Sequence, residues 1–189
     1  MRIIAGERRG TKLEAVPGMN TRPTADRVKE GLFNILQMDI DSTTRVLDVF
    51  AGTGALGLEA LSRGAHHATF IEHAGAARSV LARNIDKCHY KDRATVLAGD
   101  ARTLLPTLAG QQFDLIFLDP PYQKSLYEPI IFTLLTYHLL SDYGILVSEH
   151  AKNLPFSWNE KGLILYKTRA YGDTVLNFFR LDASNWEEK

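Results

Sequence analysis

The chain of 189 residues has little cysteine, no net charge and no long apolar run. Cys88 is its single cysteine, so an internal disulfide is impossible and a reducing compartment is expected. Lys plus Arg and Asp plus Glu number 22 each, so no overall field points to nucleic acid or to a membrane. A local basic face would still be enough to bind a polyanion.

Three absences narrow the class of protein. The longest apolar stretch, "YEPIIFTLLTYHLL", carries Glu128 and His138 and is too short to span a bilayer. The opening "MRIIAGERRG" returns to charged residues too soon for a signal-peptide core, so we expect a cytoplasmic protein without a membrane partner. The histidines lack ligand spacing with Cys88 or with acidic residues, so no metal site is expected.

From residue 41 to residue 189 the pattern alternates strands and helices. Apolar runs at 45–50, 68–73, 94–100 and 144–150 predict strands, and 113–122 predicts another that runs into a Pro-Pro turn. The stretches between them predict helices at 55–64, 76–87, 101–108 and 126–140. The end, "LILYKTRAYGDTVLNFFRL", predicts a hairpin around Gly172 and Asp173. This order indicates an α/β fold, a mostly parallel sheet with helices on both faces and an antiparallel closing hairpin.

Residues 1–40 form a different kind of segment, an extension expected to pack on the 41–189 domain. "MRIIAGERRGTKLEAV" predicts a small hairpin around Gly6 and Gly10, and "TRPTADRVKEGLFNIL" predicts a helix with Thr24 near its cap. The first 30 residues carry an excess of three positive charges in a chain that is neutral overall. We expect this face to contact phosphates through five basic residues: Arg8, Arg9, Lys12, Arg22 and Arg27. A solvated charged surface is the alternative for each of them.

The stretch "DVFAGTGALGLEA" holds a G-x-G-x-x-G at Gly52, Gly54 and Gly57, between a predicted strand and a predicted helix. That context is typical of a loop that lets backbone approach an adenosine cofactor. Ala51 belongs to the same loop, and Glu72 follows the next strand, where it is well placed to accept from ribose hydroxyls. The alternative is a turn that only packs helix on strand.

Asp48 distinguishes between the cofactors that such a loop could hold. A carboxylate at this place would repel the pyrophosphate of NAD, whereas S-adenosylmethionine offers an ammonium and a sulfonium. The sequence therefore predicts S-adenosylmethionine. Asp100, after the third strand, is expected either to accept from the adenine amine or to cap the helix that follows, and both roles are compatible.

The motif "DPPY", from Asp119 through Pro120 and Pro121 to Tyr122, follows the fourth strand. Proline has no N–H, so Asp119 and the Pro120 carbonyl can accept both hydrogens of a planar amine without a competing donor. Tyr122 offers a flat face on which an extruded base can stack. These residues predict methyl transfer to an exocyclic amine. A proline-rich turn with a capping Asp119 is the alternative.

"DVFAGTGALGLEALSRGA" and "LDPPY", with "MRIIAGERRGTKL", "TRPTADRVKEGLFNIL" and "YGDT", resemble the RsmD family of bacterial 16S rRNA guanine-N2 methyltransferases. The resemblance implies a Rossmann-like class I methyltransferase with a seven-stranded sheet in the order 3-2-1-4-5-7-6. It also implies transfer to the N2 amine of one guanine, guanine-966 in the family's usual name, in 16S rRNA of the small ribosomal subunit or an assembly intermediate.

Other hypotheses stay open at this point. An adenine-N6 DNA methyltransferase would use the same DPPY chemistry, although a chain of this length leaves little room to recognise a duplex sequence. An NAD-dependent oxidoreductase fits the glycine pattern but not Asp48, and a non-catalytic adenosine-binding module would not need Asp119 and Tyr122. We expect a monomer.

Overall fold

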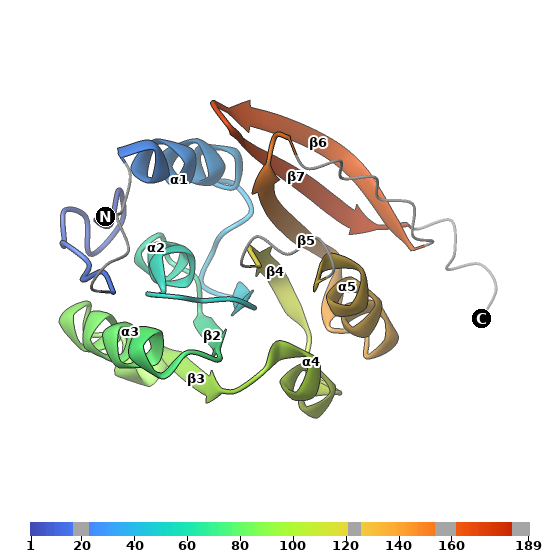
Figure 1. The fold of residues 1–189 in the computed structure, drawn as a ribbon, viewed down its shortest axis with the longest axis horizontal. Helices are drawn as coiled ribbons and strands as arrows, with labels where there is room; N and C mark the ends of the chain where they lie inside the picture. Colours follow the sequence, from blue (N-terminus) through green and yellow to red (C-terminus); the bar gives the residue numbers. More distant parts are fainter. Residues whose placement is uncertain (17–22, 121–125, 154–161, 183–189) are drawn as a thin grey trace.

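The computed structural model describes residues 1–16, 23–120, 126–153 and 162–182. One seven-stranded sheet in the order β3-β2-β1-β4-β5-β7-β6 lies at its centre (Figure 1). The strands are β1 (Arg45–Asp48), β2 (His67–Glu72), β3 (Ala94–Ala98), β4 (Phe113–Leu118), β5 (Leu140–Ala151), β6 (Leu163–Tyr171) and β7 (Thr174–Leu181). Neighbours among β1 to β5 run parallel, and β7 runs antiparallel to β5 and β6. The expected fold and strand order are confirmed.

Helices cover both faces of this sheet. They are α1 (Pro23–Ile35), α2 (Ala55–Ser62), α3 (Gly75–Lys87), the short α4 (Ala101–Leu104) and α5 (Tyr127–Thr136). Figure 1 shows α1, α2 and α3 on one side of the sheet and α4 and α5 on the other, in agreement with the two apolar clusters of the core. No helix in the described ranges is long and apolar enough to cross a membrane.

The central strands are apolar at successive positions because both of their faces are covered. In β1, Val46 packs in the layer of α1, α2 and α3, and Leu47 packs in the layer of α4 and α5. Neither side chain is exposed to solvent. Alternate residues of a strand point to opposite faces, so a continuous apolar run is what a doubly covered parallel strand requires.

The predicted helix over 126–140 is wrong at its carboxyl end. The helix stops at Thr136, and β5 begins at Leu140. His138 adopts the left-handed conformation with a φ of 51°, which ends the helical path. Leu139 and Leu140 are buried with the α4 and α5 layer after the chain has turned. The apolar composition of this stretch continues across the turn, so it did not reveal the boundary.

The N-terminal segment of residues 1–16 forms the expected small hairpin and lies against α2. Arg2 and Lys12 form an antiparallel bridge, and the Ile3 amide donates to the Thr11 carbonyl at 2.9 Å. Gly6 allows the close approach, because a Cβ there would lie 1.8 Å from the carbonyl oxygen of Ser62, and its φ is +83°. The segment is therefore packed on the α/β part of the chain.

Candidate active site

The sheet has a topological switch point between β1 and β4. The chain runs from β1 through β2 to β3 at one side, and then returns to β4 and β5 at the other. In open α/β sheets the carboxyl ends of the strands at such a point border a ligand crevice. Asp48 and Glu72 are the last residues of β1 and β2, Asp119 directly follows β4, and the charges of Glu72 and Asp119 both act on Asp48. The fold thus brings these three predicted residues together.

The three loop glycines have different surroundings. A Cβ on Gly52 would meet no atom within 4 Å, whereas one on Gly54 would lie 2.3 Å from a methyl of Leu81. A Cβ on Gly57 would lie 2.3 Å from the ring of Phe70 in β2. Gly52 therefore borders open space, while Gly54 and Gly57 allow α2 to pack closely on its neighbours. Gly54 also has a φ of +83°.

Glu72 joins the end of β2 to the glycine loop. Its Oε2 accepts from the Gly52 amide at 2.7 Å, and its Oε1 accepts from the Ala74 amide at 2.6 Å. A carboxylate has about four lone-pair positions, so both oxygens can still accept from a ligand. These bonds fix the position of the carboxylate against the loop.

Asp48 is a buried carboxyl group under the same loop. Its Oδ2 accepts from the Gly57 amide at 3.1 Å. Burial raises the pKa of Asp48 to about 7, the Gly57 N–H opposes this rise, and the charges of Asp119 and Glu72 add to it. The crevice therefore has an excess of negative charge that a cation would relieve.

Asp119 and Pro120 stand where β4 ends. The Asp119 side chain reaches solvent at the bottom of a small hollow, and Pro120 is buried. Because protein surrounds the hollow, the pKa of Asp119 is raised by desolvation. The lining residues come from α1, α2 and the strands β4, β5 and β7: Leu32, Leu56, Phe117, Leu118, Asp119, Val147, Glu149 and Leu176. We call this the Asp119 hollow.

Glu149 is an acidic residue of this hollow that the sequence reasoning missed. It lies near the end of β5, the strand beside β4. Burial first, and then the charge of Asp119, raise the pKa of its carboxyl group. The position of Glu149 at the carboxyl end of a central strand was the available signal.

Asp100 caps α4. Its Oδ1 accepts from the Arg102 amide at 2.9 Å, and its two carboxylate oxygens bind the Arg102 guanidinium at 3.0 and 2.6 Å. The Arg102 side chain holds the pKa of Asp100 at about 2. The capping role expected from the sequence is thus present, and the adenine role stays a prediction.

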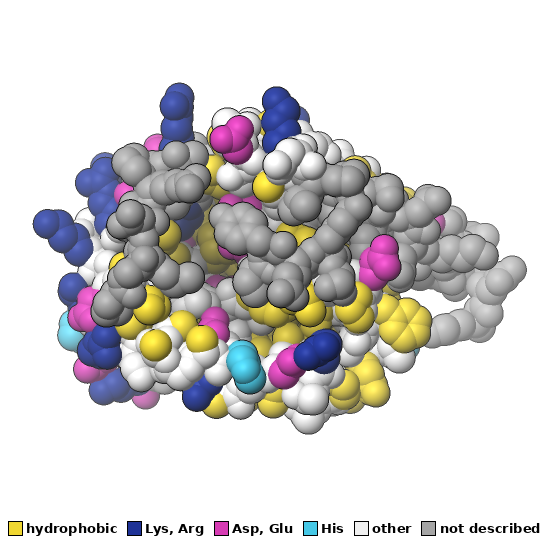
Figure 2. All heavy atoms as spheres, in the orientation of Figure 1, with side chains coloured by type: hydrophobic (Ala, Val, Ile, Leu, Met, Phe, Trp, Pro, Cys, Tyr) yellow, Lys and Arg dark blue, Asp and Glu magenta, His cyan; other side chains and the backbone are white. Residues whose placement is uncertain are grey.

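Of the five basic residues expected to contact phosphates, the structure describes Arg8, Arg9, Lys12 and Arg27. Arg9, Lys12 and Arg27 are exposed. Arg8 is half-buried, with its guanidinium 3.0 Å from Glu7 and 5.8 Å from the centre of the Tyr90 ring. Figure 2 shows Lys and Arg side chains gathered at the left, where Figure 1 places the N-terminal segment, α1 and α3. Arg22, Pro121 and Tyr122 lie outside the described residues.

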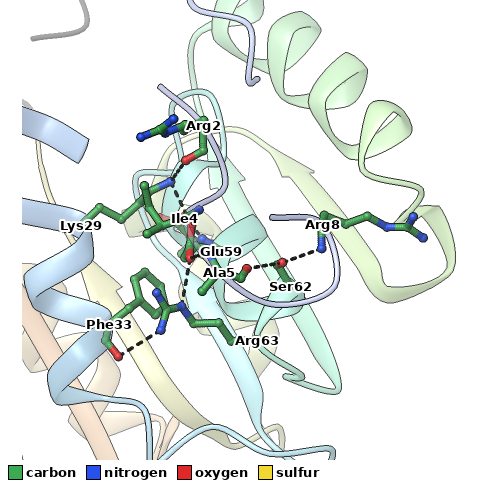
Figure 3. Close-up of polar contacts among 11 residues, drawn as sticks. Arg2, Ile4, Ala5, Arg8, Lys29, Phe33, Glu59, Ser62 and Arg63 are labelled. Atoms are coloured by element: carbon green, nitrogen blue, oxygen red, sulfur yellow. Dashed lines mark hydrogen bonds and ion pairs between the residues drawn. The ribbon is translucent and has the colours of Figure 1, made fainter. Parts of the chain in front are cut away.

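Glu59 of α2, which the sequence did not single out, anchors the N-terminal segment (Figure 3). Its fully buried carboxylate accepts from the amides of Ile4 and Ala5 at 2.8 and 3.0 Å. It also pairs with Lys29 at 3.1 Å and with Arg63 at 2.9 Å. Lys29 in turn donates from its ammonium to the carbonyl of Arg2 at 2.6 Å. One side chain therefore joins α2, α1 and the segment that carries Arg8, Arg9 and Lys12.

Comparison with known sequences identifies the family. The family described as "Conserved hypothetical protein 95" matches residues 1–180. The Escherichia coli K12 protein named "Ribosomal RNA small subunit methyltransferase D" is 42% identical over 155 residues, which cover 79% of this chain and 71% of that protein. The chain belongs to the RsmD family.

Two further proteins, named a putative rRNA methyltransferase and a putative methyltransferase, match over nearly the full length. YlbH of Bacillus subtilis is 35% identical over 182 residues, which cover 95% of this chain and 98% of YlbH. The solved structure of yhhF from Escherichia coli superposes with a TM-score of 0.84 at 33% identity, covering 97% of this chain and 98% of that one. The N-terminal segment and the sheet are therefore shared features of the family's fold.

Proposed function

We propose that this RsmD-family chain transfers a methyl group from S-adenosylmethionine to the N2 amine of one guanine in 16S rRNA, guanine-966 in the family's usual name. The observation that carries the proposal is the placement of Asp119 and Pro120 at the end of β4, in the crevice that the glycine loop borders. The relatives named "Ribosomal RNA small subunit methyltransferase D" support rRNA of the small subunit as the substrate.

The residues of the crevice fit S-adenosylmethionine. Ala51, Gly52 and Gly54 lie in the loop before α2, and Gly57 lies in the first turn of that helix. A ligand can approach the loop backbone at Gly52, with Glu72 held beside it. Glu72 is assigned to the ribose hydroxyls and Asp100 to the adenine amine, in addition to the cap. Asp48 is assigned to the positively charged end of the cofactor, because a cation favours the ionised form of a carboxyl group whose pKa burial has raised.

Asp119 and Pro120 position the acceptor. When bound, S-adenosylmethionine supplies an electrophilic methyl group on a sulfonium. Asp119 and the Pro120 carbonyl accept the two amine hydrogens and so direct the nitrogen lone pair out of the ring plane. Once the amine has accepted the methyl group it would have one proton too many, and Asp119 would take this proton and pass it to solvent. Positioning of this kind accounts for most of the expected acceleration.

Delivery of the base is assigned to Tyr122 and to the basic face. Tyr122 would stack on the extruded guanine, with Pro121 shaping the turn before it. Arg9, Lys12 and Arg27 are exposed and suited to phosphate contacts, with Arg22 as a fourth candidate, whereas Arg8 is partly engaged by Glu7 and Tyr90. A loop guanine of folded rRNA is the natural target, because extrusion from a loop costs least.

The test uses small-subunit particles from a strain that lacks this methyltransferase, incubated with a labelled methyl donor. Mass mapping should find one N2-methylguanine. Asp119→Ala should lower turnover by roughly a hundredfold or more, because it removes the side chain that accepts from the amine and positions it. The variant should bind S-adenosylhomocysteine as wild type does. Wild-type turnover in the variant would refute the role of Asp119, and methylation of adenine in duplex DNA instead of the particle would favour a DNA methyltransferase.

A further inference from the structure

Asp119 and Glu149 stand side by side at the ends of two neighbouring parallel strands. Phe117 pairs with Val147 and Leu118 with Ser148 in the register of β4 and β5. One step further along both strands, the same register brings Asp119 beside Glu149. Phe117 and Val147 face the layer of α1, α2 and α3, so the residues two positions later point to the same side. Both carboxyl groups accordingly line the Asp119 hollow.

This acidic pair is unusual because the other side chains that line the hollow are apolar. Leu32 of α1, Leu56 of α2 and Leu176 of β7 surround it with apolar side chains. The backbone carbonyl of Glu149 accepts from the Tyr127 hydroxyl of α5, which ties the end of β5 to that helix. Burial, and the charge of Asp119, both raise the pKa of Glu149. Two neighbouring carboxylates in such a place are stabilised by a ligand that brings two N–H donors side by side.

Guanine presents that pattern at the edge that carries its N2 amine. The amine hydrogens lie next to the N1–H, so the edge offers adjacent donors. The N6 amine of adenine lies next to N1 without a hydrogen, which is a lone pair. The N1–H of guanine favours the ionised form of a carboxyl group, which accepts hydrogen bonds only, whereas the N1 lone pair of adenine would repel that form.

We propose that Glu149 is a specificity-determining residue that accepts a hydrogen bond from the N1–H of the target guanine while Asp119 and Pro120 hold its N2 amine. This inference rests on the proposed function, because it assigns the base at the same site. It also distinguishes the N2 amine of guanine from the N6 amine of adenine, either of which the DPPY motif could hold. Asp119 and Pro120 recognise an amine, and Glu149 recognises what lies beside the amine.

The experiment compares two particles that differ only at the target base. One carries guanine, and the other carries diaminopurine, which keeps the 2-amine but has no hydrogen on N1. Wild type should methylate the guanine particle with a kcat/KM about tenfold or more above that of the diaminopurine particle. Glu149→Gln should lose most of this preference, because an amide can donate to the bare N1 as well as accept from the N1–H. The matched control is Glu128→Gln, an exposed glutamate of α5 that should keep the wild-type preference.

The measurement separates specificity from structure. A merely structural Glu149 would slow both particles by the same factor, and an unchanged preference in Glu149→Gln would overturn the proposal. Binding of S-adenosylhomocysteine checks that the variant folds. If it does not fold, Glu149→Asp can be compared on the same two particles. We expect this variant to methylate the guanine particle more slowly than wild type and the diaminopurine particle at an unchanged rate. An equal loss of rate on both particles would contradict the proposal. Failure of wild type to methylate the guanine particle would instead refute the proposed function.

Discussion

Asp48 is a side chain that favours binding of a ligand and lowers the stability of the ligand-free protein. Its carboxyl group is buried beneath the glycine loop, where Gly57 is the donor that it binds and Asp119 and Glu72 are like charges nearby. Burial of an ionisable group is costly unless a partner of opposite charge is present. A cationic cofactor would supply that partner, so we interpret the excess negative charge of the crevice as preparation for binding.

This interpretation predicts a stability change that depends on pH. The pKa of Asp48 is raised from 3.8 to about 7 in the fold, so the folded chain holds this proton more tightly than the unfolded chain does. The free energy of unfolding must then fall as pH rises through that interval. Asp48→Asn should remove the loss, stabilising the cofactor-free protein above about pH 7 by a few kcal/mol, at about 1.4 kcal/mol per pKa unit, and leaving it nearly unchanged near pH 4.

Urea unfolding across this pH range, with calorimetry of S-adenosylmethionine binding, would check the prediction. The same Asp48→Asn variant should bind the cofactor more weakly, since it no longer offers a negative charge. Asp142→Asn, at an exposed position in β5, is the control and should alter neither property. Parallel pH profiles for wild type and Asp48→Asn would show that the buried carboxyl group carries no such cost.

At the scale of elements, the attachment of the N-terminal segment depends on Glu59 in α2. The carboxylate accepts from two backbone amides of the segment and pairs with Lys29 of α1. Both charged side chains of this pair are almost fully buried. Removing one member of a buried pair leaves the other charge without compensation, which is far more costly than losing an exposed pair.

Glu59→Gln should therefore destabilise the protein by about 3–5 kcal/mol and expose residues 1–16 to protease. Lys29→Met in the same chain should restore part of the loss, because the remaining buried charge is removed. Glu14, in the same segment, forms an exposed pair with Arg83 of α3, so Glu14→Gln should have little effect. Urea unfolding and limited proteolysis measure both changes. Equal, small effects of Glu59→Gln and Glu14→Gln would mean that the buried pair does not hold the segment.

The strands and the glycine loop could be predicted from sequence because their signals are local. Val46 and Leu47 belong to an apolar run that both layers of helices cover, and Gly52 falls between a strand and a helix. Glu59 had no such signal, since a glutamate within a helix usually faces solvent. Its burial depends on a segment 54 and 55 positions earlier in the chain. Glu149 was missed for a similar reason, because its significance comes from the pairing of β4 with β5.

At the scale of the whole molecule, neutrality conceals an uneven distribution of charge. The first 30 residues hold an excess of three positive charges, and the rest of the chain must therefore hold an excess of three negative ones. The anchor at Glu59 fixes the basic segment to α2, and the turn that carries Arg8 lies against Ser62 at the carboxyl end of that helix. A polyanion attracted to the basic segment would consequently be held on the α2 side of the molecule.

The salt dependence of RNA binding tests this arrangement. Arg9→Gln with Lys12→Gln removes two exposed positive charges from the segment. Each phosphate that loses its positively charged partner should reduce the slope of log affinity against log salt by about 0.7–0.9. The double variant should therefore have a slope that is smaller by up to roughly twice that amount. Lys91→Gln with Arg180→Gln removes two exposed charges outside the segment, before β3 and at the end of β7, and should leave the slope unchanged. Filter binding of small-subunit RNA at several salt concentrations gives all three slopes. If both double variants reduce the slope equally, RNA responds to the total charge of the molecule and the N-terminal segment has no special role in holding it.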